Sequence, residues 1–278
     1  MAHEFPGSDW GDWLLRDVES AIPDGVALWY LGCNGFVLKA DDGTTVFIDP
    51  YCGNGDPPRI SRMIPVPFDP ADVRECDAVF ATHEHSDHVH GATQRPILAG
   101  TAATYYGPDD SLTVASEESW TDTEGVSDEQ FVELDAGDTV ELGAFTVHVE
   151  PANDPDATHP VSYVFEHDAG TFFHGGDARP GDAFERVGDR YDVDLAALAF
   201  GSSGYLRTEE GDAFTTWYAD ESEVVAAAAQ TGTDRLLPTH WDIWRNLTAD
   251  PTALWPHVRS YDAPRTLDIV EIGDRLAL

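Results

Sequence analysis

The sequence predicts an α/β fold in which two β-sheets pack face to face and helices cover both outer faces, an αββα four-layer sandwich. Three observations support this prediction. Short apolar strand patterns fill the first half of the chain, the same pattern returns in the second half, and helical patterns lie between the strands. With 278 residues, of which 42% are hydrophobic, the chain is long enough to bury a sizeable core. We therefore expect one domain that spans residues 1–278.

The first half begins with a short helix, expected at residues 10–21. Apolar runs that follow it predict strands at residues 26–31, 35–40, 45–48 and 77–81. Between the last two strands, the proline-rich segment 54–67 is typical of a loop. The strand at 77–81 runs directly into a cluster of histidines, so it is the element that matters most for function.

The second half repeats this organisation. Strands are expected at residues 144–149, 161–166, 170–173, 195–199 and 235–238. A helix is expected at residues 221–230, because Asp220 and Glu223 form a capping-box pattern. A second helix is expected at residues 251–260, where Asp250 can cap the helix and Pro251 suits its first position.

The charge balance is extreme. The chain has 52 acidic and 15 basic residues, a net charge of −37, and Lys39 is its only lysine. At about 1 M ionic strength the Debye length is about 3 Å, so repulsion among dispersed carboxylates is screened in concentrated salt and destabilising in dilute buffer. The composition therefore indicates a halophilic source. The same negative field argues against nucleic acid and anionic membranes as partners.

The chain shows no sign of export. Its N-terminal residues lack a basic region followed by an apolar run, and no apolar stretch is long enough to span a bilayer. Its three cysteines, Cys33, Cys52 and Cys76, are an odd number at irregular spacing, which indicates reduced thiols. Cys33 and Cys52 are expected to be small buried residues rather than nucleophiles, since neither stands beside an obvious base. We expect a cytoplasmic protein that acts on a small molecule.

The most informative segment is residues 82–88, which read Thr-His-Glu-His-Ser-Asp-His. Imidazoles and a carboxylate are ligands that zinc and manganese accept. If the strand ends just before His83, the turn can direct His83 and His85 toward one ion, and Asp87 and His88 toward a second ion. A metallohydrolase is therefore the first interpretation.

Two later residues stand in the same context, at the end of an apolar strand. Asp177 follows the run Phe-Phe-His-Gly-Gly, whose glycines allow a tight turn, so its carboxylate could bridge two ions. His240 follows Leu-Leu-Pro-Thr and would complete the shell of the second ion.

With these motifs the chain resembles the metallo-β-lactamase superfamily, and within it the L-ascorbate-6-phosphate lactonase family. The narrowest motifs are Leu-Gly-Cys-Asn-Gly at residues 31–35, His-Trp-Asp-Ile-Trp-Arg-Asn at 240–246 and Ala-Asp-Pro at 249–251. Further matching segments are residues 9–14, 51–55, 77–83 and 201–202. The similarity runs from about residue 9 to about residue 251. It implies the αββα sandwich of the metallo-β-lactamase fold and favours a homo-oligomer.

The resemblance also implies a ligand set for two divalent ions, zinc or manganese. His83 and His85 bind the first ion, Asp87, His88 and His240 bind the second, and Asp177 bridges them. For the third ligand of the first site we favour Asp154, with His159 as the alternative. Asp87 and His88 are the candidate catalytic residues, and Asp87 is a ligand, a base or both.

The implied reaction is the hydrolysis of a sugar lactone. Two cations lower the pKa of a shared water from 15.7 toward about 7, and the resulting hydroxide attacks the lactone carbonyl. Two alternatives remain open. One is another hydrolysis by the same fold, of a phosphodiester or an amide, and the other is a metal-binding homologue without turnover.

The chain departs from that family after Asp177, where Ala178 and Arg179 stand in place of a serine and a histidine. A phosphorylated substrate would need a basic clamp. The candidates are Arg59, Arg62, Arg179, Arg207 and Arg245. Trp241 and Trp244 flank the site and could stack on a sugar ring, although two tryptophans after a strand are more often packing residues.

Overall fold

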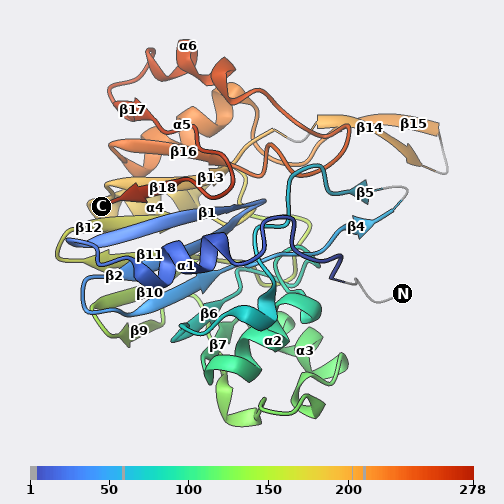
Figure 1. Cartoon of the computed structure of the whole chain (residues 1–278). Coiled ribbons are helices and arrows are strands. Elements are labelled where there is room, and N and C mark those ends of the chain that lie inside the picture. Colours follow the sequence, from blue (N-terminus) through green and yellow to red (C-terminus); the bar gives the residue numbers. More distant parts are fainter. Residues whose placement is uncertain (1–4, 58–59, 202, 209–210) are drawn as a thin grey trace.

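The computed structural model describes residues 5–57, 60–201, 203–208 and 211–278. Within these residues most strands belong to two seven-stranded sheets (Figure 1). The first sheet has the order β18-β1-β2-β3-β6-β7-β8. Its strands are β1 (Val26–Gly32), β2 (Gly35–Ala40), β3 (Thr45–Ile48), β6 (Ala78–Phe80), β7 (Thr104–Gly107), β8 (Phe131–Glu133) and β18 (Arg275–Ala277).

The second sheet has the order β17-β16-β13-β12-β11-β10-β9. Its strands are β9 (Thr139–Leu142), β10 (Phe145–Pro151), β11 (Val161–His167), β12 (Gly170–His174), β13 (Leu195–Ala199), β16 (Arg235–Thr239) and β17 (Thr266–Leu267). Two hairpins stand apart from the sheets and extend from the same side of the molecule (Figure 1). They are β4 (Gly55–Asp56) with β5 (Ile60–Ser61), and β14 (Ser203–Thr208) with β15 (Gly211–Thr216).

The helices lie on the outer faces of the sheets. The α-helices are α1 (Trp13–Ser20), α2 (Gly91–Thr101), α3 (Asp109–Glu117), α4 (Asp182–Arg190), α5 (Glu221–Thr231) and α6 (Trp255–Val258). Short 3₁₀ turns are η1 (Pro70–Asp72), η2 (Trp120–Asp122), η3 (Asp128–Gln130) and η4 (Pro251–Leu254). In the part of the chain that the structure describes, no helix combines the length and apolar character needed to cross a bilayer.

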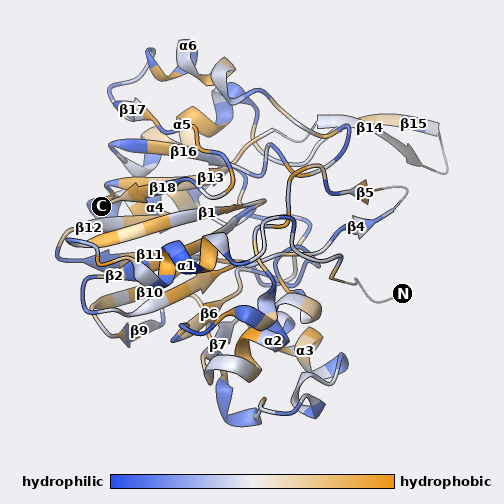
Figure 2. Cartoon of the chain, in the orientation of Figure 1, coloured by the Kyte–Doolittle hydropathy of each residue, from blue (hydrophilic) through white to orange (hydrophobic). Residues whose placement is uncertain are grey.

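Three apolar layers hold these elements together, and Figure 2 shows hydrophobic segments on both strands and helices. Phe36, Phe80, Phe165 and Phe172 are buried in the layer between the sheets. A second layer joins the first sheet to α1 and α2, and a third joins the second sheet to α4 and α5. This arrangement confirms the predicted αββα sandwich, since each sheet buries one face on the other sheet and one on helices.

The expected strands are present, and those at residues 35–40, 45–48 and 195–199 have the predicted bounds. The expected helix at 251–260 is wrong as a single element. It divides into η4 and the four-residue α6, and Pro256, second in α6, has no amide hydrogen to continue the ladder. The first helix begins at Trp13, after Gly11 with a φ of 62°.

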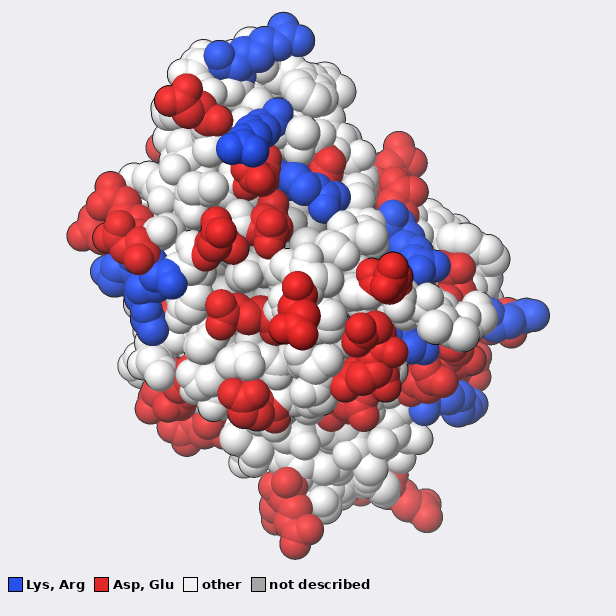
Figure 3. Space-filling model, turned by 90° about the vertical axis from the view of Figure 1, so that its left-hand side faces the viewer, with Lys and Arg blue, Asp and Glu red and all other residues white. Residues whose placement is uncertain are grey.

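Acidic side chains are spread over the surface rather than gathered in one tail. Figure 3 shows them across one face of the molecule, with Lys and Arg side chains scattered among them. This agrees with the dispersed acidic pattern of the sequence.

The carboxyl ends of several strands lie at one edge of the sandwich. β3 and β6 are parallel in the first sheet, and β12, β13 and β16 are parallel in the second. Because parallel neighbours end at the same edge, the residues after β3, β6, β12 and β16 come together there. These are the segments that carry the predicted ligands.

Candidate metal centre

The histidine loop follows β6 directly, as predicted. Asp49, the residue after β3, accepts hydrogen bonds from the Thr82 backbone nitrogen at 2.9 Å and from Thr82 Oγ1 at 2.8 Å. These bonds hold the start of the loop against the neighbouring strand. The backbone nitrogen of His88 then donates to the His85 carbonyl at 2.9 Å, which closes a turn and returns His88 toward the sheet.

A first group of possible ligands consists of His83, His85, Asp154 and Asp177. One ligand atom from each lies within 4.8 Å of the others. His83 Nε2 is 3.0 Å from His85 Nδ1, 3.7 Å from Asp154 Oδ2 and 3.9 Å from Asp177 Oδ2. Two imidazoles and two carboxylates at this spacing can surround one divalent cation.

A second group consists of His88, Asp177 and His240, with Asp87 beside it. Asp177 Oδ2 is 3.3 Å from His88 Nε2 and 3.5 Å from His240 Nε2. Asp87 Oδ2 is 3.3 Å from His240 Nε2. Asp177 is thus common to both groups of possible ligands.

His159 lies away from both groups. Its side chain is 70% exposed, and its Nδ1 is 2.6 Å from Asp110 Oδ2. Asp154, by contrast, is buried in the first group. Of the two candidates for the third ligand of the first site, the structure therefore brings Asp154 to the cluster.

Cys33 contacts the second group, which the sequence did not reveal. Its Sγ lies 3.3 Å from His240 Nε2 and 3.6 Å from Asp87 Oδ2. The expectation that no base stands beside Cys33 is therefore wrong, because its neighbours come from segments far along the chain.

Cys33, Asp87 and His240 form a third set of atoms that could hold an ion. Burial raises the pKa of the Cys33 thiol. The three cysteines are free, as predicted.

The unpaired atoms of these groups fit metal ligands. Within the described residues, His88 Nε2 and Asp154 Oδ2 are buried and have no hydrogen-bond partner. A buried polar atom without a partner is costly, and coordination of a cation would remove that cost. Asp177 Oδ1 accepts a hydrogen bond from Asn34 Nδ2 at 3.1 Å, which orients the carboxylate and leaves Oδ2 facing the histidines.

Asp49 is a functional residue that the sequence interpretation missed. It is fully buried, and its Oδ2 lies 2.8 Å from His88 Nδ1. This contact assigns the Nδ1 proton to the Asp49 side and leaves Nε2 free to bind a cation, the usual partnership of a metal-binding histidine with a carboxylate. The signal was available, because Asp49 directly follows an apolar strand, as the predicted ligands do.

The electrostatics of the two groups differ. Burial, together with the neighbouring His88, lowers the pKa of His83 to about 3. Burial also disfavours the charged form of His240, but Asp177 and Asp87 outweigh it and raise the pKa of His240 to about 9. Although burial opposes its ionised form, the carboxyl of Asp177 keeps a pKa well below its usual value because His240 and His88 lie beside it.

Backbone strain marks the same edge of the sandwich. Cys33, Asp49 and His240 have φ angles of 60°, 43° and 64°, in the left-handed region. A residue other than glycine costs about 1–2 kcal/mol there. The His240 nitrogen donates to the Cys33 carbonyl at 2.7 Å, which ties two of these turns together.

A cavity of about 330 Å³ opens beside the clusters. It is lined by Ile60, His85, Asp87, Asp154, Asp156, Asp177, Trp217, Tyr218, Trp244 and Leu247. Trp244 reaches it, as expected, but Trp241 packs against the core of the second sheet, and its Nε1 donates to the Pro238 carbonyl at 3.1 Å. Trp241 is therefore not among the lining residues. Tyr218 was missed, and its Oη lies 3.1 Å from His240 Nε2.

Arg179 is not among the described residues that line this cavity. Its guanidinium donates to Asp156, one of the lining residues. Arg59 and the side chain of Arg207 lie outside the described residues.

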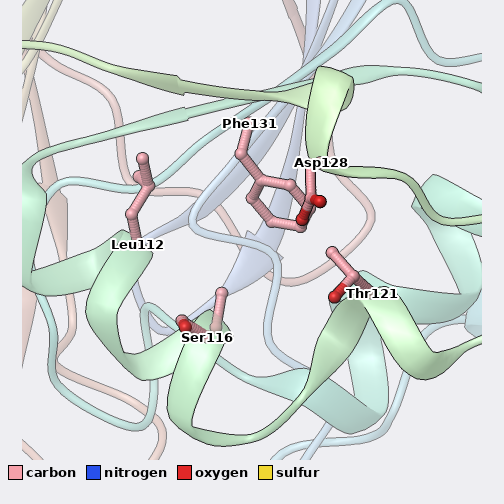
Figure 4. Close-up of a pocket in the computed structure, with 6 residues that line it drawn as sticks. Leu112, Ser116, Thr121, Asp128 and Phe131 are labelled. Atoms are coloured by element: carbon pink, nitrogen blue, oxygen red, sulfur yellow. The ribbon is translucent and has the colours of Figure 1, made fainter.

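A smaller cavity of about 140 Å³ lies elsewhere, among α3, η2, η3 and β8 (Figure 4). Leu112, Ser116, Thr121, Asp128 and Phe131 surround it. It has one carboxylate and no imidazole among its lining residues, so it lacks the chemistry of the larger cavity.

Residues 44–241 match the family model of the beta-lactamase superfamily domain. This match covers more than half of the chain, so the protein belongs to that superfamily, as its motifs indicated. Together with the clustered histidines and aspartates, this membership makes the protein a metal-dependent hydrolase.

The chain is similar to the "Probable L-ascorbate-6-phosphate lactonase UlaG" of Escherichia fergusonii. The two are 27% identical over 292 residues, which cover 89% of this chain and 78% of the relative. Among solved structures, it is similar to Igni18, a novel metallo hydrolase from Ignicoccus hospitalis, with a TM-score of 0.67, 19% identity and coverage of 90% of this chain and 97% of that one. A possible metal-dependent hydrolase from Veillonella parvula gives a TM-score of 0.69, 15% identity and coverage of 91% and 99%. At such identities the solved structures show a shared fold.

Proposed function

We propose that the protein is a dinuclear metal-dependent lactonase that opens the ring of a sugar lactone or a related cyclic ester. The observation that carries this proposal is the pair of ligand groups that share Asp177 and face one cavity. The similarity to proteins named as probable L-ascorbate-6-phosphate lactonases supports the lactone as substrate.

The side chains divide the work between holding cations and placing the reactants. We assign His83, His85 and Asp154 to one ion and Asp87, His88 and His240 to the other, with Asp177 between them. Two divalent ions so held would supply hydroxide at neutral pH and polarise the carbonyl of the lactone. Asp87 lines the cavity, so its carboxylate can also orient a water molecule and accept its proton. His88 is kept in place by Asp49.

The donor set suits zinc or manganese. Imidazole favours zinc, whereas carboxylates also suit manganese, and the two groups combine both kinds of ligand. Elemental analysis of the purified protein distinguishes the two metals. A content of about two ions per chain is the expected result.

Activity assays on site variants test the proposed function. The metal-loaded protein, kept in concentrated salt, is offered a panel of lactones, phosphodiesters and amides. We expect lactone opening that Asp87→Ala and His240→Ala each reduce by about a thousandfold or more, because each variant removes a ligand of the nucleophile-generating site. His159→Ala is the matched control, since its exposed imidazole lies away from the clusters, and it should retain activity.

Other results would favour the competing functions. Faster cleavage of a phosphodiester or an amide than of every lactone would indicate another hydrolase of the same fold. Stoichiometric metal with no turnover on the whole panel would indicate a metal-binding homologue without activity.

We further infer that the protein is a single domain that works in the cytoplasm of a salt-adapted cell and assembles as a homo-oligomer. The net charge of −37 supports the salt adaptation, and the three free buried cysteines support a reducing compartment. The exposed aromatic pair Tyr205 and Phe214, on the β14–β15 hairpin, offers an apolar contact for a second copy. Sedimentation in concentrated salt measures the oligomeric state.

A further inference from the structure

The cavity beside the metal centre has a polar part and an apolar part. Its polar lining is made of the ligand groups with Asp156 and Tyr218. The remaining lining residues are Ile60, Trp217, Trp244 and Leu247, which we call the apolar wall. Trp244 is fixed in place, because it is buried and packs against the ring of Tyr51, with the two ring centroids 5.8 Å apart. A rigid aromatic and aliphatic surface next to a reactive centre holds the apolar part of a ligand.

Among the described residues, no cationic side chain lines this cavity, since neither Arg nor Lys is among its lining residues. Arg62, a candidate for binding phosphate, directs its guanidinium to backbone carbonyls, those of Ile64 at 3.0 Å and Pro65 at 2.8 Å. Arg179 is paired with Asp156. Neither guanidinium is therefore available for the bidentate contact that usually recognises a phosphate.

The metal centre would add little attraction for a further anion. Asp87, Asp154 and Asp177 would offset three of the four positive charges that two divalent cations bring. The hydroxide that such a centre supplies would offset the fourth. Beyond the ligands, Asp156 adds a negative charge to the cavity lining, which Arg179 balances. An anionic group on the substrate would thus meet no net positive field.

We propose that the substrate is an uncharged lactone, without a phosphate group, whose apolar chain or ring face lies against the apolar wall. This inference rests on the proposed lactonase function, and it narrows the substrate class of the same site. The wall places the apolar part, and the ligand groups face the ester bond. This substrate class therefore differs from L-ascorbate 6-phosphate, the compound in the name of the relatives that are 27% identical.

Calorimetry with unreactive ligands tests this proposal separately from turnover. The ligands are γ-lactams, in which a ring N–H replaces the ring oxygen of the lactone, with side chains from methyl to butyl. The metal-loaded protein in concentrated KCl should bind them about fourfold more tightly for each added methylene, the gain expected from burying one CH₂ group. A hydroxymethyl lactam should bind at least as tightly as its phosphate ester.

Variants of the wall sharpen the test. Trp244→Ala should flatten the dependence on chain length, and Leu247→Ala, at a partly buried position, is a second variant in case loss of Trp244 disturbs folding. Trp255→Ala is the matched control, because this exposed tryptophan of α6 is not among the lining residues, and it should keep the dependence.

Two results would overturn the inference. One is an affinity that does not change with chain length in the wild-type protein. The other is tighter binding of the phosphate ester by tenfold or more, lost in Arg59→Ala or Arg207→Ala. Failure of the protein to open any lactone would instead contradict the proposed function, while the lactam affinities would still report on the apolar wall.

Discussion

Asp49 shows how one side chain can organise a site without facing the substrate. Its carboxylate accepts hydrogen bonds from the backbone nitrogen and the hydroxyl of Thr82, and its Oδ2 lies beside His88 Nδ1. Asp49 therefore sets both the path of the histidine loop and the direction of one imidazole. It does this from a backbone conformation with positive φ. A residue held this way at the end of a strand fixes ligand geometry before any cation arrives.

Replacement of Asp49 should therefore weaken metal binding. We expect Asp49→Asn to lower the affinity for zinc or manganese by about 10–100-fold, because His88 loses the carboxylate that orients it. Chelator competition measures the affinity, and circular dichroism verifies folding. Asp77→Asn is a suitable control, since Asp77 bonds the Thr45 backbone at 2.8 Å, at the start of β3. Equal affinities of wild type and Asp49→Asn would contradict the assigned role.

Metal affinity should also depend on pH. In the metal-free protein the pKa of His240 is raised to about 9, and that of His88 is raised well above its usual value by Asp177 and Asp49, against the effect of burial. The imidazole of His240 is therefore protonated at pH 7, and the raised pKa of His88 favours its protonated form, so each must lose a proton to bind a cation. As the pH rises toward 9, affinity should increase by up to about tenfold per unit for each proton displaced.

Calorimetry in buffers of different ionisation enthalpy measures the proton release directly. More protons should be released on metal binding at pH 7 than at pH 10. Metal affinity that is constant from pH 6 to pH 9 would show that these imidazoles are neutral before the cation binds.

At the scale of elements, local sequence signals and packing contribute differently. The helix α5 begins where its capping box predicts, with Asp220 accepting bonds from the Ser222 and Glu223 nitrogens at 2.9 Å. The hairpins β4–β5 and β14–β15 carried no comparable signal, and the first was predicted as loop. β4 and β5 are only two residues each. An isolated antiparallel β-bridge pairs the backbone of Arg62, just after β5, with that of Trp244, which is distant in sequence.

Removal of the cap should destabilise the fold measurably. We expect Asp220→Ala to lower the free energy of unfolding by about 1 kcal/mol, because two amide groups at the start of α5 lose their acceptor. Denaturant unfolding in concentrated salt measures the change. Asp220→Asn retains a capping oxygen and should lose much less, so an equal loss in both variants would argue against capping as the cause.

At the scale of the whole molecule, the surface charge and the packing of the apolar layers act on stability in opposite directions. The buried layers on both faces of each sheet stabilise the sandwich. The net charge of −37 opposes compaction by self-repulsion. Salt screens that repulsion without changing the packed core, so stability should depend on ionic strength.

Thermal unfolding in KCl tests the inferred adaptation to salt. Between about 0.1 M and about 1 M, where the Debye length falls from about 10 Å to about 3 Å, we expect the melting temperature to rise by about 10 °C, equivalent to a few kcal/mol for a chain of this size. Sucrose at the same osmolality serves as the uncharged control. A melting temperature that responds equally to both would attribute the effect to solvent exclusion rather than to charge.

The sequence by itself determined the αββα class and most strand positions, because apolar runs and caps act over a few neighbouring residues. It also determined the histidine loop, whose ligands lie within six residues of one another, and it indicated Asp177 and His240 through their places after apolar strands. It missed α2, α3 and α4, and it failed to divide the helix at 251–260, where packing and Pro256 outweigh the local pattern.

Only the tertiary structure decided which distant side chains meet. It brought Asp154 rather than His159 to the first group, placed Cys33 beside His240 across 207 positions of sequence, and set Asp49 behind His88. It also directed Trp244 toward the cavity and packed the partly buried Trp241 against the apolar layer of the second sheet. The physical reason is that local patterns define where strands begin and end, whereas contacts between strand ends depend on the order and register of the two sheets.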